Sequence, residues 1–346
     1  MKVLLLLGRS TGGIGTQAAE LARELRALGV EVLVVTDEAT AARFDLGPSV
    51  RRWWPASPRG AGRALPDLLR LRAAMARADL VHAHGHQVGV FACALAGRTP
   101  VVVTWHNPAP PGPVPARAAR FVARRADAVT GASSDLVEAA RRDGAAQAWL
   151  SPVPSPKVAA LLAQPRDIPE VPMVLTVSRI APQKELGVLV AAAARLSAPA
   201  PPWTVVGDGV PQLRAELEAT ARHTGVPVRF VGADADVAGW LRRASVFVLT
   251  SRWEARALVV QEAMAAGVPV VATDVGGLRD LVAGHGLLVP PGDAAAVAAA
   301  VDRVLGDPGL AARLSAGGRE AARSWPDGRD TARNWLRWYE RLAPMT

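Results

Sequence analysis

The sequence predicts an α/β protein with two doubly wound halves, each built on a parallel sheet. Short apolar runs alternate with amphipathic helical patterns along the whole chain, which is typical of parallel sheets covered by helices. At 346 residues the chain is too long for one ordinary core. A proline-rich segment, Ser151–Pro156, interrupts the alternation near the middle, because closely spaced prolines disfavour both helix and central strand.

Ten apolar runs are predicted to form the strands. Those of the first half are Lys2–Leu7, Glu31–Thr36, Leu80–His82, Val101–Thr104 and Ala128–Thr130. Those of the second half are Val174–Val177, Trp203–Val206, Val228–Phe230, Val246–Leu249 and Val268–Ala272. Two such halves facing each other are expected to form a ligand cleft.

The proline-rich segment gives the expected domain boundary. We predict a first domain over residues 1–155, a second over 156–325 and a final helix in 326–346. That last segment carries an aromatic stripe at helical spacing, made of Trp335, Trp338, Tyr339 and Leu342. Such a stripe is more typical of core packing than of ligand binding.

The charge is uneven along the chain. Residues 1–150 contribute +7 of the total formal charge of +9. Nearly all basic residues are arginines, the exceptions being Lys2, Lys157 and Lys184. The excess of arginine over lysine, together with the many alanines, indicates a composition bias of the genome. No nucleic-acid partner is predicted. The lone lysine in a motif, Lys184, is therefore informative.

Targeting signals are weak in this sequence. The apolar run Val3–Leu7 is shorter than the core of a signal peptide, and no run approaches the roughly 20 apolar residues of a spanning helix. Cys93 is the single cysteine, which excludes an internal disulfide. We expect a cytoplasmic protein, with a peripheral position at the inner face of the membrane as an open alternative.

Two carboxylates, Glu254 and Glu262, lie eight positions apart where a loop is predicted to enter a helix. The apolar run Ala263–Ala266 follows, and Gly267 and Pro269 are typical of a helix end. Carboxylates at such a loop can hold the hydroxyl groups of a sugar or a ribose.

This stretch resembles the E-x7-E signature of the retaining glycosyltransferases of family four, which have the two-domain GT-B fold. The resemblance implies transfer of a hexose-type sugar from a nucleotide diphosphate sugar to an acceptor hydroxyl. It also implies that Glu262 holds the ribose and Glu254 the sugar. The resemblance also implies that main-chain amides of the residues after Glu254 help to hold the sugar hydroxyls. These residues are Ala255, Arg256, Ala257 and Leu258. The family often has glycine where Ala255 stands.

Arg179 and Lys184 follow a predicted buried strand, and two cations there can neutralise a pyrophosphate. The alternative is a solvated pair. In the family, an arginine and a lysine at this spacing bind the donor diphosphate and stabilise it as the leaving group. The chain departs from the family at Glu185, where a glycine is common.

Two glycine-rich segments are candidate parts of the donor site. The loop Gly8–Thr16 lacks the lysine of a P-loop and the spacing of the dinucleotide fingerprint. It resembles the family's glycine loop, which implies that Gly13 and Gly15 face the donor diphosphate and the acceptor; the alternative is a tight turn. Gly232 resembles the family glycine whose main chain contacts the base, so the side chains do not reveal the base.

Histidines cluster at the predicted strand ends of the first half. His106 follows a buried strand, and the resemblance implies that it contacts the donor sugar; a structural histidine is the alternative. His82, His84 and His86 have strand spacing that mimics a metal site. No carboxylate or cysteine lies close in sequence to complete one, so no metal is predicted. The family needs neither a catalytic metal nor another cofactor.

The segment Arg51-Arg52-Trp53-Trp54 combines charge with aromatic rings. It predicts a contact with an anionic membrane, a stacking surface for the acceptor, or an ordinary loop. The acceptor itself is expected to be a small molecule or a lipid. Two other functions stay open: a GT-B enzyme that transfers no sugar, such as a nucleotide-sugar epimerase, and a non-catalytic subunit that binds nucleotide sugars.

Overall fold

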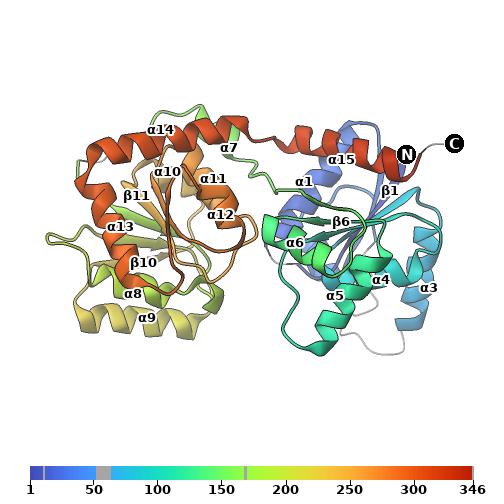
Figure 1. Cartoon of the computed structure of the whole chain (residues 1–346), viewed down its shortest axis with the longest axis horizontal. Helices are drawn as coiled ribbons and strands as arrows, with labels where there is room; N and C mark the ends of the chain where they lie inside the picture. Colours follow the sequence, from blue (N-terminus) through green and yellow to red (C-terminus); the bar gives the residue numbers. More distant parts are fainter. Residues whose placement is uncertain (11, 52–63, 167–169, 345–346) are drawn as a thin grey trace. The chain divides into compact units, whose positions relative to one another are not determined.

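The structure, a computed structural model, describes residues 1–10, 12–51, 64–166 and 170–344. The chain divides into two compact units. The first unit comprises Met1–Pro154 and Pro326–Thr346, and the second comprises Ser155–Trp325. Each unit contains one parallel sheet covered by helices (Figure 1), so the predicted fold class is confirmed.

The first unit has a seven-stranded parallel sheet with the order β3-β2-β1-β4-β5-β6-β7. The five longer strands occur where the apolar runs predict them. The short edge strands β3 and β7 were missed, because two and three residues carry too little pattern. The strands are β1 Lys2–Leu7, β2 Glu31–Val35, β3 Val50–Arg51, β4 Leu80–His84, β5 Val101–Trp105, β6 Ala128–Gly131 and β7 Ala148–Leu150.

Helices cover both faces of this sheet (Figure 1). Along the chain they are α1 Gly13–Ala27, α2 Glu38–Arg43, α3 Ala64–Met75, α4 His86–Leu95, α5 Pro113–Arg125 and α6 Ser134–Arg142. Helix α1 turns its apolar face to the sheet, and its Leu21 and Leu25 belong to the same buried apolar cluster as Leu5 of β1. The glycine-rich loop that precedes α1 therefore lies at the carboxyl end of β1.

The last helix, α15 Gly328–Leu342, belongs to the first unit. The carboxylate of Asp327 caps it by accepting a hydrogen bond from the main-chain N–H of Asp330 at 2.8 Å. Its Trp335 and Tyr339 are fully buried, and the helix packs beside α1 (Figure 1). The aromatic stripe is thus part of the core.

The second unit has a six-stranded parallel sheet with the order β10-β9-β8-β11-β12-β13. Its strands are β8 Val174–Val177, β9 Trp203–Val206, β10 Val228–Gly232, β11 Val246–Leu249, β12 Val270–Thr273 and β13 Leu287–Val289. The predicted start of β12 at Val268 was wrong. The N–H of Val268 instead donates to the carbonyl of Ala263, closing the preceding helix, and Gly267 has the left-handed φ of 77° typical of such an end.

The helices of the second unit pack on both faces of its sheet and enclose two apolar clusters. They are α7 Val158–Leu162, α8 Leu186–Ala193, α9 Pro211–Thr224, α10 Val237–Arg242, α11 Leu258–Ala265, α12 Gly276–Val282, α13 Ala294–Gly306 and α14 Pro308–Ser324. A short 3₁₀ turn, Pro182–Lys184, precedes α8. Within the described residues no helix is long and apolar enough to cross a bilayer.

Candidate active site

The polar residues predicted for the donor site gather at the carboxyl ends of β8 and β11, which are neighbours in the sheet. Arg179 and Lys184 follow β8, and Glu254 follows β11. In open parallel sheets, ligands bind at this edge, where the chain leaves neighbouring strands. The second unit therefore has a candidate ligand site of its own.

Lys184 and Glu254 form a buried ion pair. The ammonium of Lys184 contacts Oε1 of Glu254, and the two side chains are only 14% and 11% exposed. The hydroxyl of Ser251 donates to the same oxygen at 2.7 Å. Because an isolated buried charge is costly, removing either member of the pair would leave the other without its partner.

Hydrogen bonds clamp the loop of Lys184 to the loop of Glu254. The hydroxyl of Thr250 donates to the carbonyl of Lys184 at 3.0 Å. The N–H of Arg252 donates to the carbonyl of Gln183 at 2.9 Å, and the Gln183 amide donates to the carbonyl of Trp253 at 2.7 Å. The ion pair is consequently held by both backbones.

Glu185 has a left-handed backbone, with φ 45° and ψ 44°. This geometry suits the glycine that the family often has here, and a residue with a side chain is strained in it by about 1 kcal/mol. The Glu185 carboxylate accepts two hydrogen bonds from Arg252, at 2.9 and 2.6 Å. Since the Arg252 side chain is 74% exposed, that pair offsets little of the strain.

The backbone next to Arg179 packs closely against the turn that follows β9, which contains Gly207 and Gly209. The N–H of Ile180 donates to the carbonyl of Asp208 at 3.0 Å. A Cβ added to Gly207 or Gly209 would lie 2.0 Å from the carbonyl oxygen of Ser178 or of Ile180. Only glycine permits this approach. Among the described residues no carboxylate pairs with the exposed guanidinium of Arg179.

The loop between Glu254 and α11 is pinned from the side of α12. The N–H of Gly277 donates to the carbonyl of Glu254 at 2.8 Å, and a Cβ on Gly276 would lie 2.3 Å from that carbonyl oxygen. Four main-chain N–H groups of this loop and of the first helical residue have no hydrogen-bond acceptor within the described chain. They belong to Ala255, Arg256, Ala257 and Leu258.

The Arg256 side chain is turned into the protein. Its guanidinium lies 5.4 Å from the ring centre of Trp325, a cation–π contact. Burial lowers the pKa of Arg256 to about 10, opposed by the nearby charge of Asp280. Arg256 could therefore reach a ligand through its main chain only.

Glu262 lies on α11, 8% exposed. Burial raises the pKa of this carboxyl, while the hydrogen bond from Ser155 and the charge of Lys157 lower it. The Ser155 hydroxyl donates to Oε1 at 2.8 Å. Gly232, the remaining candidate of this unit, ends β10, and its carbonyl accepts from the N–H of Gly207 at 2.7 Å.

In the first unit, His106 follows β5 and is 5% exposed. Its Nε2 lies 3.1 Å from Nδ1 of His84, which ends the neighbouring strand β4. Burial lowers the pKa of both rings, that of His84 to about 4. Two neutral imidazoles at this distance share one proton as a hydrogen bond, so His84 orients His106.

The other two histidines of the cluster also bond to neighbours, although Nδ1 of His86 is buried and has no hydrogen-bond partner among the described residues. His82 contacts the hydroxyl of Tyr339 at 2.6 Å and that of Thr104 at 2.7 Å, so it ties α15 to the sheet. His86 bonds the carbonyl of Asn107 at 2.9 Å. Over the described ranges, no three His, Cys, Asp or Glu side chains are arranged to hold a metal ion.

The glycines of the first loop have different surroundings. Gly13 begins α1, and a Cβ there would meet no atom within 4 Å. Gly15 is buried, and a Cβ there would lie 2.2 Å from the ring of Phe44, so packing alone requires this glycine. Arg51 is exposed at the end of β3. The rest of its predicted motif, residues 52–54, lies outside the described residues.

Comparison with known proteins places the chain in a family. Residues 11–171 match the family described as Glycosyltransferase Family 4, and residues 162–321 match Glycosyl transferases group 1. The D-inositol 3-phosphate glycosyltransferase of Frankia alni is 33% identical over 91% of this chain and 91% of its own length. That of Xylanimonas cellulosilytica is 32% identical, over 90% and 88%.

Solved structures agree on the fold. HepE of Anabaena, in complex with UDP and glucose, superposes with a TM-score of 0.82 at 23% identity, covering 99% of this chain and all of HepE. Sucrose-phosphate synthase of Thermosynechococcus elongatus gives 0.81 at 26% identity, covering 99% and 98%.

The chain thus belongs to the family-four glycosyltransferases of GT-B fold. It is an enzyme that transfers a sugar from a nucleotide sugar, as the sequence predicted. An epimerase or a non-catalytic subunit is not favoured, because the relatives that cover 90% and 91% of this chain are named as glycosyltransferases.

Sequence reasoning missed several residues of the site. Ser155, Ser251 and Thr250 each donate to a predicted site residue. Their types carry no signal, because serine and threonine are common in loops. For Ser155 the flanking prolines were a signal, since they hold one residue in place.

Proposed function

We propose that the second unit binds the nucleotide diphosphate sugar and that a hexose is transferred with retained configuration. The observation that carries the proposal is the buried pair of Lys184 and Glu254 at the sheet edge, beside four main-chain N–H groups without acceptors in the described chain. A cation, a carboxylate and amides are what a sugar diphosphate requires.

In this proposal Lys184 and Arg179 bind the diphosphate. As the bond to the sugar breaks, negative charge grows on the departing phosphate, and fixed cations stabilise that charge more than the ground state. The two cations take the place that a metal ion has in other transferases. The departing phosphate itself accepts the proton of the attacking hydroxyl, on the same face of the sugar.

The sugar and the ribose are held by separate carboxylates. We assign the sugar hydroxyls to Glu254 and to the amides of Ala255–Leu258. The ribose hydroxyls we assign to Glu262, and the base to the main chain near Gly232. Gly13 and Gly15 of the first unit would face the diphosphate and the acceptor, and His106 would contact the donor sugar. A neutral His106 suits this role, because it can donate or accept a hydrogen bond without placing charge beside the sugar.

The acceptor is proposed to be a small molecule or a lipid. Relatives that cover most of the chain are named for D-inositol 3-phosphate, which makes inositol phosphate the first acceptor to test. UDP sugars are the first donors to test, because HepE is described in complex with UDP and glucose.

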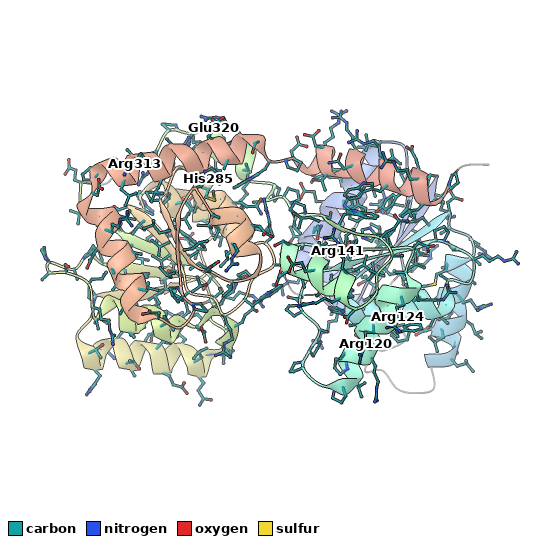
Figure 2. All side chains as sticks on the ribbon, in the orientation of Figure 1. Arg120, Arg124, Arg141, His285, Arg313 and Glu320 are labelled. Carbon is teal, nitrogen blue, oxygen red and sulfur yellow. The ribbon has the colours of Figure 1, made fainter. Side chains whose placement is uncertain are left out.

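We also propose that the protein is cytoplasmic and contacts an anionic membrane through the first unit. Helix α5 contains no acidic residue. Three exposed arginines share one face with Phe121 and Val114, which are 42% and 70% exposed; Arg120 and Arg124 are labelled in Figure 2. A helix that is basic and apolar on its outer face fits such a surface. The arginines, none paired with a carboxylate in the described chain, are Arg117, Arg120 and Arg124.

A thermal-shift screen of nucleotide diphosphate sugars tests the donor assignment, because a ligand of the folded state raises the melting temperature with its concentration. We expect one base to stand out among the UDP, GDP and ADP sugars. A melting temperature unchanged by all of them at millimolar concentration would contradict the proposal.

A further inference from the structure

Ser155 belongs, by sequence, to the proline-rich connection between the halves, yet its side chain is part of the second unit. Its hydroxyl donates to Oε1 of Glu262 at 2.8 Å, across 107 residues of sequence. The two residues are 5% and 8% exposed. A contact between two buried groups so far apart is set by the fold and not by the local chain.

The hydroxyl of Ser155 both donates and accepts a hydrogen bond. The N–H of Lys157 donates to its oxygen at 3.4 Å, so the single hydroxyl proton is left for Glu262. The N–H of Ser155 also donates to the side-chain oxygen of Gln261, at 3.3 Å. Ser155 therefore contacts two successive residues of α11.

The prolines on both sides hold the backbone of Ser155. Proline fixes its own φ, which restrains Pro154 and Pro156. The residue before a proline is confined to extended conformations, and Ser155 precedes Pro156. The serine thus reaches the carboxylate with little conformational entropy left to lose.

One oxygen of Glu262 is occupied by this contact and the other is not. Among the described residues no group donates a hydrogen bond to Oε2. Burial raises the pKa of Glu262, and the hydrogen bond from Ser155 opposes this rise. Ser155 therefore both orients the carboxylate and favours its ionised form, the form that accepts two hydroxyl protons at once.

We propose that Ser155 is a positioning residue of the nucleotide site, holding Oε1 of Glu262 so that Oε2 accepts the vicinal hydroxyls of the ribose. The inference rests on the proposed function, which assigns the ribose to Glu262. A serine that only satisfied a buried carboxylate would contribute to stability and not to recognition of the ribose.

The test is a calorimetric comparison of two ligands on the whole chain. One is whichever of UDP, GDP and ADP raises the melting temperature most, and the other is its 2′,3′-dideoxy analogue. Ser155→Ala should weaken the first about tenfold, because a hydrogen bond to a charged group is lost. It should weaken the dideoxy analogue less than about twofold. Ser155→Cys, similar in volume but a weak donor, should give the same pattern if the alanine variant folds poorly.

Ser133→Ala is the matched control. The buried Ser133 also donates to a carboxylate, Asp135, at 2.5 Å, but lies in the first unit. This variant should lose stability and keep both affinities.

The outcomes distinguish a failure of the proposed role of Ser155 from a failure of the proposed function. Suppose that the wild type binds the nucleoside diphosphate more tightly than its dideoxy analogue. The inference would then be overturned if the Ser155 variants lost the same affinity for both ligands, or lost none. A wild type that binds the diphosphate without preferring the ribose would overturn the role of Glu262 and the inference together. No binding of any of the three diphosphates would overturn the proposed function itself.

Discussion

The carboxylate of Glu254 contacts the ammonium of Lys184 in a buried ion pair. The lysine that is proposed to meet the diphosphate is therefore shared with the residue that is proposed to hold the sugar. Donor binding need not bring a free cation into the site. In the proposed complex, phosphate oxygens would accept hydrogen bonds from the remaining ammonium protons of Lys184.

Replacement of Lys184 should act on both turnover and stability. Lys184→Ala is expected to lower kcat at least about tenfold, because a stabiliser of the leaving group is lost. It should also lower the free energy of unfolding, by up to about 3 kcal/mol, since a buried carboxylate is left unpaired. Steady-state kinetics and urea unfolding measure the two effects. In Lys184→Ala/Glu254→Gln, part of the stability should return but not the turnover.

Lys2→Ala is a matched control for this experiment, because Lys2 pairs with Glu31 at the surface, 2.8 Å apart. It should change unfolding by less than about 1 kcal/mol and leave kcat unaltered. Normal turnover in a folded Lys184→Ala protein would remove Lys184 from the mechanism.

The two carboxylates of the signature should have separable effects. Glu262→Ala is expected to weaken binding of the free nucleoside diphosphate. Glu254→Ala should spare that binding and impair reaction of the complete sugar donor, because only the donor carries the sugar. Calorimetry with the diphosphate and kinetics with the donor distinguish the two. If both variants lost the same nucleotide affinity, the assignment would be wrong.

Acidity should weaken donor binding through Glu262. Burial raises the pKa of this carboxyl above its unfolded value, so it takes up a proton before an exposed glutamate does. As the pH falls through the raised pKa, the ionised form is lost and affinity for the ribose declines. A nucleotide sugar is the suitable ligand, because its diphosphate does not titrate in this range.

Glu262→Gln should show a weaker pH dependence of this affinity between about pH 7 and pH 5. Between the unfolded and the folded pKa, folding takes up a proton at Glu262, so its contribution to stability falls as the pH rises. Unfolding curves should therefore show the variant gaining stability relative to the wild type from pH 5 to pH 7. A constant difference would contradict the raised pKa.

The left-handed backbone of Glu185 leads to a prediction about stability. Glu185→Gly should be more stable than Glu185→Ala by about 1 kcal/mol, because glycine adopts this conformation without strain. Both variants lose the exposed pair with Arg252, so their difference isolates the backbone. Urea midpoints at a shared slope measure it. A less stable glycine variant would show that the backbone at this position is not left-handed in solution.

The face of α5 is testable by charge reversal. Arg120→Glu/Arg124→Glu should reduce binding to anionic vesicles, and wild-type binding should fall from low to physiological salt, because screening weakens it. Sedimentation with neutral vesicles gives the baseline. Arg222→Glu/Arg313→Glu, an equal charge change at exposed sites of the second unit (Arg313 in Figure 2), should leave binding unchanged. Equal pelleting with neutral and anionic vesicles would remove the membrane from the account.

The sequence predicts the two α/β halves because each long strand is a self-contained apolar run. It does not predict edge strands such as Val50–Arg51, whose existence depends on pairing with β2. The end of α11 shows a similar limit. Gly267 and Pro269 predict where the helix stops, but the hydrogen bond that commits Val268 to the helix end has no sequence signal.

The candidate site is also predictable from the sequence only in part. Residue types and spacing lead to Lys184, Glu254 and Glu262 one at a time. Their partners are invisible in sequence, because Lys184 and Glu254 are 70 residues apart and Ser155 and Glu262 are 107 apart. At Glu185 the sequence shows that the family's common glycine is missing. Only the structure shows that the backbone keeps the left-handed form that suits glycine.

Retaining transfer is tested by the configuration of the transferred sugar, which proton NMR reads from the anomeric signal. An α-linked nucleotide sugar that binds in the thermal-shift screen is incubated with inositol phosphate and with a panel of small-molecule and lipid acceptors. We predict a new glycoside with the α configuration of the donor, formed at least about tenfold more slowly by Lys184→Ala. A β-configured product, or an epimerised donor without any glycoside, would contradict this prediction.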